Sequence, residues 1–310
     1  MRWNELKARV EVGYYRVLRV KVGHTASSHP PHLYFVRDTL RDTGGPVRLL
    51  ICLALMSAFW IGAGTRPGLA QDAGEFEPNR ADIVRLLGEV PDYAPIREEL
   101  IALGFEGENL ELAVSHAELV YRDPVLAGHV ADQVISAFLD PGNAQVAGGL
   151  IWPMVERGLG HLNARELRFY YRVERSLIGG LPVRDCGRAV RNRLPPARFA
   201  ELITRAAARL NTSGLREYYR IQARAARFGI QREPVRLSQG RADDVEAEIN
   251  AQIRASIERS GQPSSLLTAL DDLNDATNRQ ACEIGKLFLE TVVAMSGQDG
   301  RDALIYMSLP

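Results

Sequence analysis

The sequence predicts an all-α protein, a multi-helix array in which two tandem αα-hairpins pack against acidic flanking helices. The first observation is a repeat with a 48-residue period, because the pattern of residues 167–173 (LRFYYRV) returns at residues 215–221 (LREYYRI). The second is that Asn163 and Asn211 precede the two copies, and each asparagine follows a run with helical apolar periodicity. The third is that no stretch after residue 70 shows the apolar–polar alternation between turn residues that is typical of strands. Each copy is therefore predicted to be a helix, a short polar corner and a second helix.

Residues 1–46 differ in composition from the rest of the chain. They hold two of its three lysines and three of its six histidines, whereas nearly every basic residue beyond residue 70 is an arginine. A signal peptide normally starts within a few residues of its apolar core, and such a core begins at Val47. We therefore interpret residues 1–46 as an annotation artefact upstream of the true translation start, or as a disordered extension.

Residues 47–70 have the features of a secretory signal peptide. Basic residues flank the start of the apolar run Val47–Gly64, and the small residues Gly68 and Ala70 occupy the −3 and −1 positions of a cleavage site. Cleavage near Ala70 would leave a periplasmic or secreted chain that begins at Gln71 and has no stable membrane span. The alternative is an uncleaved membrane anchor, because the apolar run is just long enough to span a bilayer.

Charge divides the predicted mature chain into three parts, although the net charge of the whole chain is zero. Residues 71–156 hold 4 basic and 16 acidic residues, residues 157–241 hold 19 and 6, and residues 242–310 hold 5 and 12. Turn signals place the domain boundaries close to these changes of sign. The predicted parts are an acidic helical region at 71–143, a basic tandem helical-hairpin repeat at 144–232, and a C-terminal helical region at 233–310 that packs on the repeat.

Four helices are expected in the acidic region. Pro91, Gly104 and Gly107 interrupt its periodicity, and Asp123-Pro124 supplies a cap followed by proline at the first helical position. A turn at 140–143 (DPGN) ends the region. The expected helices are Asn79–Val90, Tyr93–Leu103, Asn109–Tyr121 and Val125–Leu139.

The remaining helices follow from the same kinds of signal. In the repeat, the first helices are expected at Trp152–Leu162 and Phe199–Leu210, and the second helices after the two asparagines. Beyond Pro234, a narrow apolar stripe at every fourth residue predicts a helix that packs along one edge, with Val245, Ile249, Ile253 and Ile257 inside. After a loop at 261–265, a single long apolar helix is expected from Leu266 to Val293. Residues 303–307 are expected to dock as a short helix or edge segment.

Cysteine usage predicts one disulfide bond. Cys52 lies in the predicted signal peptide, so an exported chain would keep only Cys186 and Cys282. In the chain-entropy model, the large loop between them would make this bond worth about 4 to 5 kcal/mol. The alternative is two buried free thiols. A metal site is not expected, because no cysteine pair has ligand spacing such as C-x-x-C.

Four arginines gather on one face of each second helix of the repeat. These two stripes consist of Arg165, Arg168, Arg172 and Arg175 in the first copy, and of Arg216, Arg220, Arg224 and Arg227 in the second. In one interpretation the acidic flanking helices pair with the stripes. In the other the stripes stay open and bind an anionic envelope component or an acidic protein surface. Nucleic acid is not an expected partner of an exported protein.

The apolar face of each second helix carries one polar residue at a matching position. Glu174 follows Tyr170 by four residues, and Gln222 follows Tyr218 by four, so hydroxyl and polar head can share one patch. One interpretation is a structural cluster in which Glu174 is paired and hydrogen-bonded. The other is a small-ligand-binding or hydrolytic site in the cleft between the Tyr170/Glu174 and Tyr218/Gln222 helices, since burial raises a carboxyl pKa toward the range of a general acid.

The sequence has no motif that identifies a reaction. After residue 70 its three histidines stand alone, and no nucleophile elbow, phosphate-binding glycine loop or zinc-protease motif occurs. No catalytic residue, cofactor or metal is therefore expected. The sequence predicts an exported, non-enzymatic structural or interaction module of the bacterial cell envelope, with the cleft site as the alternative.

Overall fold

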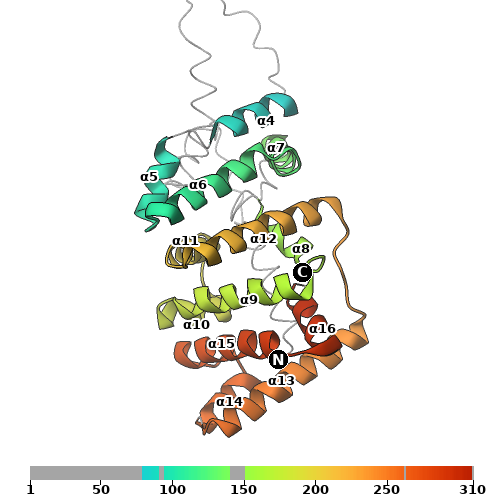
Figure 1. Ribbon diagram of the computed structural model, residues 1–310. Helices are drawn as coiled ribbons and strands as arrows, with labels where there is room; N and C mark the ends of the chain where they lie inside the picture. Colours follow the sequence, from blue (N-terminus) through green and yellow to red (C-terminus); the bar gives the residue numbers. More distant parts are fainter. Residues whose placement is uncertain (1–78, 91–93, 140–150, 262, 309–310) are drawn as a thin grey trace, which may run out of the picture. The chain divides into compact units, whose positions relative to one another are not determined.

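The computed structural model describes residues 79–90, 94–139, 151–261 and 263–308, and within these ranges it contains helices and no strand (Figure 1). The thirteen α-helices are α4 (Arg80–Glu89), α5 (Ala94–Ala102), α6 (Gly107–Arg122), α7 (Pro124–Leu139), α8 (Trp152–Leu159), α9 (Ala164–Gly179), α10 (Val183–Val190), α11 (Pro196–Ala207), α12 (Thr212–Gln231), α13 (Gln239–Arg259), α14 (Ser264–Asp271), α15 (Asn278–Ala294) and α16 (Gly297–Ser308). The all-α prediction is confirmed. Residues 1–46, the predicted signal peptide at 47–70 and the predicted turn at 140–143 lie outside the described residues.

The acidic region forms the four helices that its caps and breaks predict. The Asn79 side chain accepts a hydrogen bond from the Ala81 amide at 2.9 Å and so starts α4. Asp123 ends α6 and accepts hydrogen bonds from the first amides of α7, which begins at Pro124. Helices α4, α6 and α7 pack on one another. A small separate core lies between α4 and α7 and contains Ile83, Leu87, Val130 and Ala131.

Each corner of the repeat is an asparagine N-cap. The Asn163 side chain accepts a hydrogen bond from the Glu166 amide at 3.0 Å, and the Glu166 carboxylate accepts one from the Asn163 amide, which makes a capping box for α9. Asn211 accepts a hydrogen bond from the Gly214 amide at 2.7 Å and starts α12. The predicted order of helix, corner and helix therefore occurs twice.

The helices of the repeat pack across the two copies, which corrects the prediction of two self-contained hairpins. Helix α8 from the first copy lies along α12 from the second, and α9 from the first contacts α11 from the second (Figure 1). Glycines decide the first of these contacts. A Cβ atom on Gly158 would lie 1.8 Å from the Ala225 carbonyl oxygen, and one on Gly229 would lie 1.9 Å from that of Met154. Only glycine at both positions lets the two helices approach this closely.

The C-terminal region has one helix more than the sequence predicts. The apolar stripe of α13 is buried as expected, but the long helix expected from Leu266 to Val293 is two helices, α14 and α15. Residues 271–275 (DDLND) are poor helix formers, and Thr277 then starts α15 with a capping box to Gln280. The expected tail segment is the buried part of α16, where the Tyr306 hydroxyl donates to Glu246 at 2.7 Å.

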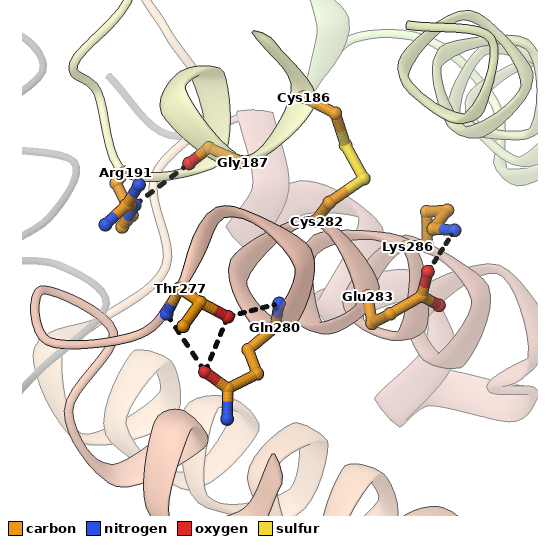
Figure 2. The surroundings of a disulfide bond; sticks show 8 residues. All are labelled: Cys186, Gly187, Arg191, Thr277, Gln280, Cys282, Glu283 and Lys286. Carbon is orange, nitrogen blue, oxygen red and sulfur yellow. Dashed lines mark hydrogen bonds and ion pairs between the residues drawn. A yellow bond between two sulfur atoms is a disulfide. The ribbon is translucent and has the colours of Figure 1, made fainter. Parts of the chain in front are cut away.

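The predicted disulfide is present and joins α10 to α15 (Figure 2). Cys186 and Cys282 have Cα atoms 5.2 Å apart, and both residues are buried. Helix α10 was not predicted, because it is only eight residues long and contains Gly187. That glycine is required by the packing, since a Cβ atom there would lie 2.1 Å from the backbone of Asn278 on α15. Among the described helices, none combines the length and the apolar character that a membrane crossing requires.

Candidate functional site

The two ends of the α12 arginine stripe pair with the acidic region. Arg216 forms an ion pair with Glu108 in the first turn of α6. Arg227 donates to the Asp123 carboxylate, with its Nη2 atom 2.7 Å from the acceptor oxygen. The pKa of Asp123 is lowered, because hydrogen bonds from Arg227 and from the α7 amides outweigh the effect of partial burial. The stripe thus ties α12 to the start of α6 and to the junction of α6 and α7.

The middle of the same stripe pairs with the first copy of the repeat. Arg220 and Arg224 both donate to one Glu166 carboxylate oxygen, at 3.0 Å and 2.7 Å. Arg220 also donates to Glu217 on its own helix. The Glu166 side chain is only 7% exposed, so its charge needs these partners to be tolerated. Glu166 therefore combines two tasks, since it caps α9 and receives two arginines from α12.

The α9 stripe is divided between paired and unpaired arginines. Arg168 donates to the Met295 carbonyl oxygen at 3.1 Å, and Arg175 forms an ion pair with Glu290 on α15 at 3.0 Å. Arg165 and Arg172 are exposed, and neither forms an ion pair with another described residue. Most of the eight predicted arginines are thus used within the protein. Exposed pairs contribute about 0 to 1 kcal/mol each, so their main effect is to set how neighbouring helices lie.

The structure brings Tyr170, Glu174 and Tyr218 together between α9 and α12, whereas their spacing predicted only that Tyr170 and Glu174 share one face of a helix. The Tyr218 hydroxyl donates to a Glu174 carboxylate oxygen at 2.5 Å. The rings of Tyr170 and Tyr218 stack with centroids 5.5 Å apart. Gln222, one turn beyond Tyr218, is also buried. Tyr170, Glu174 and Tyr218 form the tyrosine–glutamate cluster.

Burial controls the charge of this cluster. The Glu174 carboxyl is enclosed, although the residue as a whole keeps intermediate exposure. Burial of the carboxyl group raises the pKa of Glu174 to about 7. Hydrogen bonds from Tyr218 and Tyr170 act in the opposite direction, and the nearby charge of Glu156 adds to the increase. The tyrosine pKa values are raised well above their usual range, again mainly by burial, so both hydroxyls remain donors. The carboxyl group of Glu174 can therefore take up or release one proton near neutral pH, whereas the tyrosine hydroxyls of the cluster stay protonated.

No known protein family, curated protein or solved structure matches this chain. Within the described ranges, no group of three or more histidine, cysteine, aspartate or glutamate side chains is placed to hold a metal ion.

Two features of the site were missed by sequence reasoning. Glu166 was not singled out, although its position three residues after Asn163 is the signature of a capping box. His116 was considered isolated, but its ring stacks on Tyr219 of α12 with centroids 4.1 Å apart. Burial lowers the pKa of His116 to about 4, so this imidazole is neutral and belongs to the α6–α12 contact.

Proposed function

We propose that this chain is an exported helical protein that acts as a structural or interaction module of the bacterial cell envelope. The Cys186–Cys282 disulfide is the observation that carries the proposal. Disulfides persist in oxidising compartments such as the periplasm and are rare in the bacterial cytosol. The bond joins two helices that already touch at Gly187, so the local backbone geometry suits an oxidised pair. The signal-peptide features of residues 47–70 favour the same compartment.

The succession of helix contacts supports an interaction role. Helix α6 contacts α12, α12 contacts α9, α9 contacts α15, and α15 contacts α13. In repeat proteins, such neighbour-to-neighbour packing builds extended surfaces on which partners bind. The arginine stripes fit this role as internal ties, because their carboxylate partners come from α6, α9 and α15. On this proposal the stripes stabilise the scaffold and a different surface binds the partner.

Fractionation with thiol trapping tests the proposal. The full-length chain is expressed with a C-terminal tag in a Gram-negative host, the periplasm is released by osmotic shock, and denatured samples react with a maleimide–polyethylene glycol. We expect a periplasmic protein, shortened to begin near Gln71, that gains mass only after reduction. Cys282→Ala is the matched control, because it leaves one thiol that reacts without reduction. A cytosolic full-length chain with reactive Cys186 and Cys282 would contradict the proposal.

The tyrosine–glutamate cluster favours one second candidate, a small-ligand-binding or hydrolytic site. The supporting observation is that Glu174 holds a proton near neutral pH between two tyrosine hydroxyls. A carboxyl group in that state can donate a proton to a leaving group. Its two hydrogen-bond partners are equally compatible with a purely structural cluster.

Glu174→Gln separates these two candidates, because the amide keeps the shape but cannot transfer a proton. A panel of chromogenic p-nitrophenyl esters and glycosides provides the assay, and Glu258→Gln is the control for an exposed carboxylate outside the cluster. Hydrolysis that is lost in Glu174→Gln and kept in Glu258→Gln, with unchanged circular dichroism, would establish the second candidate. Equal behaviour of the wild type and both variants would exclude it for these substrate classes.

A further inference from the structure

Four neighbouring arginines on α10 and just after it form no ion pair with a carboxylate of the described residues. The α10 patch consists of Arg184, Arg188, Arg191 and Arg193. Arg184, Arg188 and Arg191 follow one another at intervals of four and three residues, so they share one face of the helix. Figure 2 shows Arg191 extending from α10 apart from the disulfide.

Neutral oxygens hold three of these arginines, Arg188, Arg191 and Arg193, in place. Arg188 donates twice to the Arg193 carbonyl oxygen, at 3.3 Å and 3.0 Å. Arg191 donates to the carbonyl oxygens of Gly187 and Ala276, and Arg193 donates to that of Asn274 at 3.0 Å. Backbone carbonyls orient a guanidinium group but do not cancel its charge. These three guanidinium groups are thus held in position without an ion pair, unlike the arginines of the stripe on α12.

The carboxylates near the patch form no ion pair with its arginines. Asp185, the acid on α10, points to Arg198 at 3.7 Å. Asp272 and Asp275 are exposed in the neighbouring loop, and neither forms an ion pair with a described residue. The pKa of Arg191 is lowered, first by partial burial and then by the charges of Arg193 and Arg188. Arg191 therefore lies among like charges, those of Arg188 and Arg193.

An apolar side chain lies beside the patch. Val183, the first residue of α10, is 46% exposed, which makes it one of the few large apolar side chains on the surface of the described residues. Arg184, next to it, is exposed as well. A protruding apolar side chain flanked by arginines fits the boundary of a bilayer, where the apolar group enters the acyl region and guanidinium groups bind phosphates.

We propose that the α10 patch, with Val183, docks the protein on a membrane surface by binding the phosphate groups of anionic phospholipids. This inference deepens the proposed function and rests on it, because export places the protein beside envelope membranes. Guanidinium groups suit the phosphate because their planar N–H donors match its oxygens. Side chains that backbone carbonyls already hold in place lose less conformational entropy when they bind. Six of the eight stripe arginines have partners inside the protein, and the other two, Arg165 and Arg172, serve as the control below.

Vesicle sedimentation at low ionic strength tests the docking. The naturally processed protein is mixed with vesicles of phosphatidylglycerol or of phosphatidylcholine. The test variant is Arg184→Gln/Arg188→Gln, which leaves the loop contacts of Arg191 intact. The matched control is Arg165→Gln/Arg172→Gln, which removes the same charge from exposed positions on α9. A basic side chain near an anionic surface strengthens binding about fivefold, so the test variant should bind phosphatidylglycerol about 25-fold more weakly.

Each outcome decides the proposal. Binding to phosphatidylglycerol alone, with a loss confined to the α10 variant and an unchanged melting temperature, supports it. Equal losses in the α9 and α10 variants would show general charge attraction and overturn it. So would equal binding to phosphatidylcholine, or a melting temperature raised as much by inorganic phosphate as by the vesicles. If Arg184→Gln/Arg188→Gln fails to fold, Val183→Ser replaces it, with binding to phosphatidylglycerol expected to weaken; unchanged binding by Val183→Ser would overturn the proposal.

The vesicle result and the export result are independent. A periplasmic protein that ignores both kinds of vesicle would overturn the docking surface and leave the proposed function intact. A cytosolic protein that binds phosphatidylglycerol through Arg184 and Arg188 would contradict the proposed compartment and keep the surface.

Discussion

Removal of the disulfide should lower the stability of the folded protein by several kcal/mol. The bond between Cys186 and Cys282 spans a sequence separation of 96 residues. In the chain-entropy model, a loop of this size stabilises the folded state by about 4.7 kcal/mol at 25 °C, because the bond restricts the unfolded chain. Cys186→Ala/Cys282→Ala should therefore lose about 4 to 5 kcal/mol. For a protein of this size, the melting temperature would fall by about 10 to 15 °C.

Urea denaturation followed by circular dichroism measures this loss. The double variant should unfold at a lower urea concentration, and the wild type should match it only when reductant is present during unfolding. Reductant alone should act slowly, because Cys186 and Cys282 are 0% and 4% exposed in the folded protein. The α10–α15 contact at Gly187 stays in the variant, so the native helix content should be kept. A loss below about 1 kcal/mol, or two reactive thiols in the native protein, would refute the reasoning.

Three further perturbations test other parts of the structure. Gly229→Ala should lower the free energy of unfolding by about 2 to 3 kcal/mol, because the new methyl group pushes α8 away from α12. Gly240→Ala is the control, because its methyl group would have no atom within 4 Å, and it should leave the melting temperature unchanged. Folding raises the pKa of Glu174 from 4.5 to about 7, so the folded state binds this proton more tightly than the unfolded state does. The free energy of unfolding should therefore decrease by about 3 kcal/mol as the pH rises from below 4.5 to above 7. Glu174→Gln should remove that pH dependence from urea midpoints. Arg227→Ala should lower the free energy of unfolding by about 1 to 2 kcal/mol, because it leaves the Asp123 carboxylate without its ion-pair partner. Arg172→Ala, at an exposed position, should lower it by less than about 0.5 kcal/mol.

Local signals predicted the helices that have strong ends. Asn163 and Asn211 start α9 and α12 because a side-chain oxygen beside the first amides caps a helix in any tertiary context. Helix α10 and the division between α14 and α15 were missed. Helix α10 is too short to show a clear period, and the loop before Thr277 is held partly by Arg191 and Arg193, which lie far away in the sequence.

In the candidate site, too, contacts within one helix were predictable from the sequence and contacts between helices were not. The spacing of Tyr170 and Glu174 placed both on one helical face, so their meeting was predictable from the sequence. The partners of the arginines were not, because Glu108, Asp123 and Glu290 reach the stripes from other helices. Charge totals showed that acidic partners were available without showing which of them would pair.

By itself, the sequence determined the helical class, the corners, the cysteine pair and the faces of the second helices, since these depend on spacing and on contacts within a few residues. Only the tertiary structure decided that α8 packs on α12, that the stripes serve as internal ties, and that the α10 patch keeps its charge. The physical reason is that backbone approach and charge neutralisation depend on distance in space. Gly158 and Gly229 lie 71 positions apart in the chain, yet their two helices touch through them.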